Sequence, residues 1–130
     1  MTDPADAELI AAARAVLRER GAPGVHFIGA ALRTRSGRVF AAVNLGTNVG
    51  RASVCAEAIA LGMAAAAGDT AVERVVAVDA SGAVVSPCGI CREMLSDYAP
   101  DAGVIVPGAD GPEVAPLGAL LPNKFVRGRG

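Results

Sequence analysis

Three cysteines and one glutamate are the residues of this chain that could do chemistry together. Cys88 and Cys91 stand three positions apart in a Pro-Cys-x-x-Cys turn that leads into an expected helix, and Cys55 stands at the expected start of another helix. Zinc in a catalytic site takes three protein ligands and keeps a fourth position for water. The positive ends of two helices would favour the thiolate form of the cysteines. The spacing therefore predicts one Zn²⁺ ion held by the three thiolates.

Glu57 lies two residues after Cys55, and its carboxylate has two interpretations. It could be a fourth zinc ligand. It could also stay unbound within reach of the water at the metal, take a proton from that water and pass it to a leaving group. The start of a helix permits both arrangements. Arg92, directly after Cys91, could donate to a cysteine sulfur and so offset the excess negative charge of three thiolates.

Two other interpretations of the cysteines compete with catalysis. A structural zinc site normally has four ligands, and His26 is the only histidine that could complete one. A redox pair formed by Cys88 and Cys91 would leave Cys55 and Glu57 without a role. A catalytic zinc therefore explains more of the pattern, and a non-catalytic, zinc-stabilised binding protein is the competing class.

The composition bounds the kind of protein. A length of 130 residues, of which 52% are hydrophobic, predicts one domain over 1–130 with a sizeable core. The net charge is −1 and there is no basic run, so nothing predicts a nucleic-acid partner. No apolar run reaches the length of about 18–20 residues that a membrane span requires. The acidic N-terminus does not resemble a secretory signal, so we expect a cytoplasmic protein with reduced thiols.

The expected elements alternate between helix and strand. Apolar residues at helical spacing follow Asp3 and Asp6, and two strands joined by a turn at Ser36-Gly37 form an expected hairpin. This order predicts an α/β fold, a three-layer α-β-α sandwich with a mixed sheet of about five strands. The expected segments after the first helix are strands at 25–32 and 39–44, a helix capped by Ser53 at 54–67, a strand at 71–78, a helix at 92–98, a strand at 104–106 and a flexible tail at 126–130.

The cysteine motifs resemble those of the zinc-dependent cytidine deaminase superfamily. Cys-Ala-Glu at 55–57 and Pro-Cys-x-x-Cys at 87–91 match the all-cysteine variant of the H-x-E and P-C-x-x-C pattern of that superfamily. The likeness extends to Gly-Ala-Ala-Leu at 29–32 and to the closing Leu-Leu-Pro-Asn-Lys-Phe at 120–125. It covers free-nucleoside cytidine deaminases and blasticidin S deaminase, which is similar in length and in its alanine-rich segment after Cys-Ala-Glu.

The resemblance implies an activity and a role for several residues. The enzyme would be a zinc-dependent hydrolase that converts the cytosine amine of a nucleoside to a carbonyl and releases ammonia. Glu57 would carry the proton to ring N3 and help ammonia to leave. The main-chain N–H of Ala56 would bind the pyrimidine O2, and the Ser86 carbonyl would hold the departing amine. Asn44 matches a ribose-contacting asparagine.

Two positions depart from the pattern of cytidine deaminases. Gly46 stands where those enzymes have a glutamate that grips the ribose 3′-hydroxyl, and His26 stands where they have an aromatic residue packed on the pyrimidine ring. Blasticidin S deaminase also lacks that glutamate. The departures favour a modified cytosine nucleoside such as blasticidin S over plain cytidine, with another amino-heterocycle as the alternative.

Phe125 is the last candidate for the substrate site. It matches an aromatic residue that, in tetrameric relatives, reaches the pocket of a neighbouring subunit. The resemblance thus implies a homotetramer, with a dimer as the smaller alternative.

Overall fold

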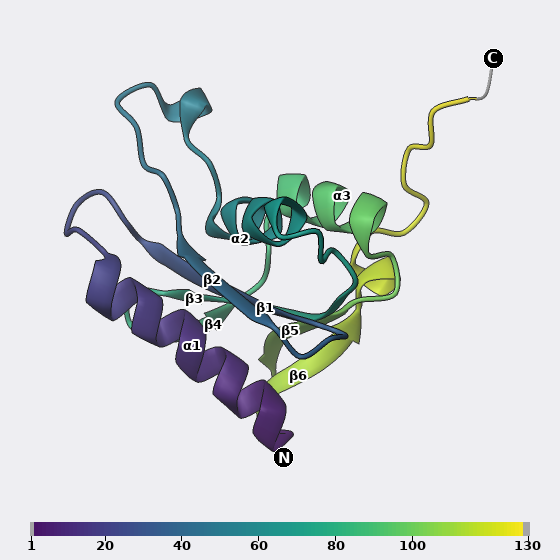
Figure 1. Ribbon diagram of the computed structural model, residues 1–130, viewed down its shortest axis with the longest axis horizontal. Helices are drawn as coiled ribbons and strands as arrows, with labels where there is room; N and C mark the ends of the chain where they lie inside the picture. Colours follow the sequence, from purple (N-terminus) through teal and green to yellow (C-terminus); the bar gives the residue numbers. More distant parts are fainter. Residues whose placement is uncertain (1, 129–130) are drawn as a thin grey trace.

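A mixed sheet of six strands lies between α1 on one face and α2 with α3 on the other (Figure 1). The computed structural model describes residues 2–128. The strands follow the order β2-β1-β3-β5-β6, and β4 pairs with β3 beside this path. Among residues 2–128, β3 and β5 pair in parallel and the other strand pairs are antiparallel. The elements are α1 (Pro4–Arg20), β1 (Ile28–Thr34), β2 (Val39–Val43), η1 (Gly50–Ala52), α2 (Ala56–Ala66), β3 (Val72–Asp79), β4 (Val84–Val85), α3 (Gly89–Tyr98), β5 (Gly103–Gly108), β6 (Gly111–Pro116) and η2 (Leu117–Leu120).

This arrangement confirms the predicted three-layer fold and adds one strand to the expected five. Residues 126–128 lie outside helices and strands and are exposed, and the last two residues of the tail expected at 126–130 lie outside the described residues. No helix within residues 2–128 combines the length and the apolar character that crossing a membrane requires.

The central strands are buried on both faces. Since successive side chains of a strand point to opposite sides, each of these strands contributes to a core cluster on either face of the sheet. Leu32, Val75 and Val104 pack in the cluster that α2 and α3 cover. Ala31 and Val76, each adjacent to one of these residues, pack in the second cluster under α1. Gly29 lets α1 approach β1 closely, since a Cβ atom there would stand 2.3 Å from the carbonyl oxygen of Ala13.

The expected hairpin at 25–44 forms with its turn at Ser36-Gly37, and Gly37 has a φ of +93°. The first strand is shorter than predicted. Residues 22–27 make a turn in which the N–H groups of Val25 and His26 donate to the Ala22 carbonyl, and β1 begins only at Ile28. The segment that enters β1 is therefore a loop rather than part of the sheet.

Helices α2 and α3 begin at the cysteines. Cys55 is the N-cap residue of α2 and Cys88 is the N-cap residue of α3. The prediction that Ser53 caps the first of these helices is wrong, because Leu45 and Val54 exchange two backbone hydrogen bonds that keep residue 54 extended. The Ser53 hydroxyl instead accepts from the N–H of Thr47. Both helices thus direct their N-terminal ends from the same layer toward one region.

Candidate metal centre and active site

The three cysteines meet at the N-terminal ends of α2 and α3. Their Sγ atoms all lie within 4.8 Å of one another, and those of Cys55 and Cys88 are 3.5 Å apart. All three are free cysteines; Cys88 is exposed, Cys55 is half-buried and Cys91 is buried. The fold therefore brings together, from two segments 33 residues apart, the donor set that the sequence predicts.

The electrostatics of the cluster call for a cation. Burial, followed by the charge of Glu57, raises the pKa of the Cys91 thiol. Burial also raises the pKa of Cys55. Partial burial pushes the pKa of Cys88 upward too, but the N–H groups of Cys91 and Ile90 bring it below its ordinary value. Three thiolates this close repel one another unless a positive ion lies between them.

Zinc fits this donor set. Zn–S bonds of about 2.3 Å in a tetrahedral site place the sulfur atoms about 3.8 Å apart. The Sγ separations here, all within 4.8 Å, allow that spacing after small rotamer shifts. Thiolates are also the ligands that zinc takes in sites without histidine. Three ligands leave one position of the tetrahedron for water.

Glu57 lies in the first turn of α2 and is only 5% exposed. Burial raises the pKa of its carboxyl group. A hydrogen bond from the backbone N–H of the same residue partly offsets this rise. Among residues 2–128, the cluster of ligand atoms within 4.8 Å of one another consists of the three cysteines and does not include this carboxylate. Of the two interpretations of Glu57, the geometry therefore supports an unbound carboxylate beside the metal.

A cavity of about 290 Å³ opens beside the cysteines. Four of the predicted site residues line it together with Cys55 and Cys88: Asn44, Ala56, Glu57 and Ser86. Phe27 and Ser53 also line it, and both were missed in the sequence. A second cavity of about 550 Å³ adjoins it, because Phe27, Asn44 and Ser53 line both.

Comparison with known proteins identifies the family. The model of the cytidine and deoxycytidylate deaminase zinc-binding region matches residues 4–106. The chain belongs to this deaminase family. It is 42% identical to the blasticidin-S deaminase of Bacillus cereus over 110 residues, which cover 78% of this chain and 79% of that protein.

Solved structures agree with the sequence comparison. The cytidine deaminase of Burkholderia pseudomallei superposes with a TM-score of 0.79 at 32% identity, covering 96% of this chain and all of that one (100%). The cytidine deaminase of Mycobacterium leprae superposes with a TM-score of 0.80 at 27% identity, covering 93% and 100% of the two chains. The three-layer fold and the cluster of three cysteines, which could hold a metal ion, thus fit a zinc-dependent deaminase.

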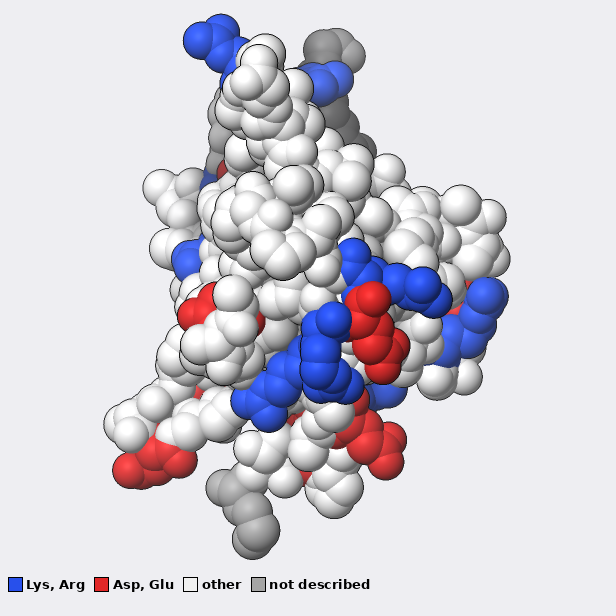
Figure 2. Space-filling model, turned by 90° about the vertical axis from the view of Figure 1, so that its left-hand side faces the viewer, with Lys and Arg blue, Asp and Glu red and all other residues white. Residues whose placement is uncertain are grey.

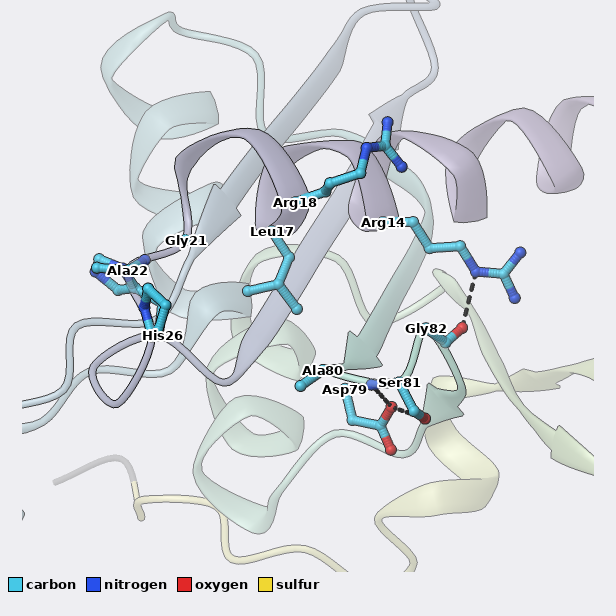
Figure 3. Close-up of a pocket in the computed structure, with 11 residues that line it drawn as sticks. Arg14, Leu17, Arg18, Gly21, Ala22, His26, Asp79, Ala80, Ser81 and Gly82 are labelled. Carbon is cyan, nitrogen blue, oxygen red and sulfur yellow. Dashed lines mark hydrogen bonds between the residues drawn. The ribbon is translucent and has the colours of Figure 1, made fainter.

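His26 lies away from the deaminase site. It lines a separate cavity of about 700 Å³ between the C-terminal end of α1 and the turn at residues 79–82, where Figure 3 shows it beside Ala22. Its Nδ1 atom accepts the N–H of Ala22 at 2.8 Å. The next residue, Phe27, lines the deaminase cavity where the family resemblance suggested His26.

Arg92 bonds to other groups than the sequence suggested, and Phe125 lies outside the cavities of its own chain, which leaves it accessible to a neighbouring subunit. Nε of Arg92 donates to the Pro87 carbonyl at 2.9 Å and Nη1 donates to the Leu120 carbonyl at 3.0 Å. These bonds go to the main chain of the cysteine turn and of η2, not to a sulfur. Phe125 is 79% exposed and lines neither of the two adjoining cavities.

Asn44 reaches the deaminase cavity but uses its side chain on the protein itself. Its Oδ1 atom accepts the N–H groups of Phe27 at 2.7 Å and Ile28 at 3.0 Å. Its Nδ2 atom donates to the Val25 carbonyl at 3.3 Å. One N–H of the carboxamide is left for any other partner.

Proposed function

We propose that this chain deaminates a cytosine nucleoside, replacing the amine at C4 with a carbonyl and releasing ammonia. The observation that carries the proposal is the buried carboxylate of Glu57, which lies outside the cysteine cluster and lines the same cavity as Cys55 and Cys88. Membership of the family supports it. A cavity of about 290 Å³ lies at the small end of ligand sites, which suits one ring rather than a large ligand.

Zinc, when bound to the three cysteines, supplies a water molecule acidic enough to act as a nucleophile at neutral pH. Glu57 takes a proton from the attacking water and delivers it to ring N3 while the new C4–O bond forms. Glu57 then transfers a second proton from that oxygen to the amine, the C4–N bond breaks and ammonia leaves. Burial raises the pKa of Glu57, which moves its proton affinity toward what such a shuttle needs.

Main-chain groups around the cavity would hold the base. The Ala56 N–H belongs to the first turn of α2, where N–H groups have no partner within the helix, so it is available to the pyrimidine O2. Ser86 also lines the cavity, and its carbonyl would accept from the leaving amine. Both contacts are part of the proposal.

The lining of the cavities favours a nucleoside over a nucleotide. Within residues 2–128, neither adjoining cavity is lined by Lys, Arg or His. A phosphate group in such a place would lose water without gaining a cation. The larger cavity offers instead the neutral polar side chains of Thr47, Asn48 and Ser53.

Among nucleosides, we propose a modified cytosine nucleoside such as blasticidin S, with another amino-heterocycle as the alternative. Support comes from Gly46, which carries no carboxylate toward a ribose, and from the 42% identity to a protein named blasticidin-S deaminase. Ammonia release from cytidine, deoxycytidine, blasticidin S and free cytosine would decide between them. Cytidine turned over most efficiently would contradict this choice.

We further propose that the chain acts as a single domain in a reducing cytoplasm, as a homotetramer or, at the smallest, a dimer. Large apolar side chains support an assembly, since Phe125 is 79% exposed and Ile90 is 68% exposed. On the face shown in Figure 2, basic side chains lie next to acidic ones, which argues against a nucleic-acid surface there. Sedimentation velocity would test the assembly.

The Glu57→Gln variant tests the catalytic proposal. The amide keeps the shape of the side chain but cannot shuttle a proton, so we expect a loss in kcat of at least about 100-fold with zinc content unchanged. Glu93→Gln is the matched control, because Glu93 is an exposed carboxylate on α3, and this variant should keep the wild-type kcat and zinc content. Wild-type rates of ammonia release from Glu57→Gln would overturn the mechanism.

A further inference from the structure

The carbonyl group of Val25 is held by two residues of the loop that follows β2. Asn44 Nδ2 donates to it at 3.3 Å. Gly46 packs directly against it, so that a Cβ atom at position 46 would stand 2.4 Å from the same oxygen. A contact of 2.4 Å with a main-chain atom cannot be relieved by a rotamer change, so any side chain at position 46 must move the backbone of Val25.

Asn44 also holds Phe27 and Ile28. Its Oδ1 atom accepts the N–H groups of Phe27 and Ile28, and its own N–H donates to the Ile28 carbonyl at 3.2 Å. Residues 25–27 precede β1, and Val25 and His26 otherwise bond only the local turn at Ala22. The side chain of Asn44 therefore replaces the sheet ladder that this segment lacks.

The segment held in this way is a wall of the substrate site. Phe27 and Ile28 line the cavity beside the cysteines, while Val25 and Phe27 line the adjoining cavity. Any shift of residues 25–28 therefore changes the shape of both cavities at once. Residues 44 and 46 sit two apart on one extended segment, so they face the same side and act on the same carbonyl.

We propose that Asn44 and Gly46 are positioning residues that clasp segment 25–28 and thereby set the wall of the site against which the base lies. This inference rests on the proposed deaminase function and differs from a direct contact between Asn44 and the sugar. Asn44 spends both lone pairs of its carbonyl and one N–H on the segment. Gly46 is required by the close approach to Val25, independently of any ligand.

A tryptophan reporter tests the clasp without depending on activity. The chain contains no tryptophan, so Phe27→Trp introduces a single emitter into the wall. In that background, Gly46→Ala and Asn44→Ala should both shift the emission maximum and change acrylamide quenching. Gly50→Ala is the matched control, because it lies in the same loop with no atom within 4 Å of the added Cβ. Unchanged emission and quenching in Gly46→Ala would overturn the clasp.

Kinetics separates a positioning role from a sugar contact. For Asn44→Ala, positioning predicts that kcat/KM falls by a similar factor for cytidine and for the analogue without 2′- and 3′-hydroxyls. A direct sugar contact predicts a loss confined to the hydroxylated substrate, and that result would overturn the proposal. If the wild type releases ammonia from no substrate, the proposed function fails, while the emission comparison still decides the clasp. Circular dichroism checks folding, and Gly46→Ala alone decides if Asn44→Ala does not fold.

Discussion

Arg92 joins the turn that contains Cys88 and Cys91 to the end of η2. Its guanidinium bonds the Pro87 carbonyl and the Leu120 carbonyl through two different nitrogens. A lysine cannot make both contacts, because its ammonium is a single point at the end of a flexible stem. We expect Arg92→Lys to have a zinc affinity roughly 10-fold lower than the wild type, because changes to the residues that orient metal ligands weaken metal binding.

Competition with a chromogenic chelator measures this loss. Arg18→Lys is the matched control, since the Arg18 side chain is 70% exposed. Equal zinc affinity of Arg92→Lys and the wild type would show that the turn holds its geometry without the guanidinium.

Single residues were predictable where the motif is local. Cys88 and Cys91 stand three residues apart at a helix start, where few backbone conformations are possible. The spacing therefore constrains the positions of both sulfur atoms. Phe27 was not predictable, because it lies in a turn-and-loop segment whose phase depends on the tertiary contact between Val25 and Gly46. A shift of one residue in such a segment exchanges the side chain that faces the cavity.

At the scale of elements, a buried ion cluster pins α1 to the sheet. Asp6 is 3% exposed; it accepts from Arg33 Nη2 at 3.1 Å and from Arg74 Nε at 3.1 Å. Asp6→Asn removes the negative charge that Arg33 and Arg74 share, so that Arg33 keeps only its ion pair with Glu73. We expect the free energy of unfolding to fall by about 3 kcal/mol.

Urea unfolding measures this change. Asp3→Asn is the control, because an asparagine oxygen still accepts the Ala5 N–H that Asp3 caps, and it should stay within about 0.5 kcal/mol. A comparable loss in both variants would mean that the charge on Asp6 has no special role.

Asp69 joins the turn between β1 and β2 to the end of α2, and this contact depends on pH. Its Oδ2 atom accepts from the hydroxyls of Ser36 and Thr34, each at 2.8 Å, and these bonds lower the pKa of Asp69. A lowered pKa in the folded state contributes stability above the unfolded pKa of about 3.9, and this contribution disappears as pH falls through the folded value.

Asp69→Asn lacks this titration. The stability difference between wild type and Asp69→Asn should therefore shrink as pH falls from about 5 toward 2. Urea midpoints over that range measure it, and a difference that is constant with pH would contradict the assignment.

Elements with a strong apolar period were predictable over almost their full length, whereas the strands held by pairing alone, β4 and β6, have weak local signals. β3 contains four buried valines, Val72, Val75, Val76 and Val78, and was expected almost in full. β6 reads Gly-Pro-Glu-Val-Ala-Pro, has little buried surface and forms because β5 offers it a ladder at the sheet edge, where proline is tolerated. β4 has two residues, too few for any period.

For the whole molecule, the order of helices and strands predicted the layers but not the path between them. The mixed sheet follows from the parallel pairing of β3 with β5, which α3 connects. β1 covers one edge of β3, and β4 and β5 share the other edge. By pairing with this edge, β4 leads the chain from β3 into the cysteine turn before α3. No local signal in the sequence predicts that β4 and β5 share an edge of β3. The space left for β4 depends on where β5, which comes later in the chain, stops pairing with β3.

Zinc should stabilise the entire fold, because its ligands join α2 to α3 and both helices cover the larger core cluster. Zinc at about 1,000 times its dissociation constant adds about 4 kcal/mol to the folded state, so chelation should lower Tm by roughly 10 °C or more. Calorimetry before and after chelation measures this shift, and added Zn²⁺ but not Mg²⁺ should reverse it. Cys91→Ser, which removes one thiolate, should show a smaller response to chelation. An unchanged Tm after metal analysis has shown complete removal would mean that the cysteine cluster holds its geometry without the ion, and that zinc serves the reaction alone.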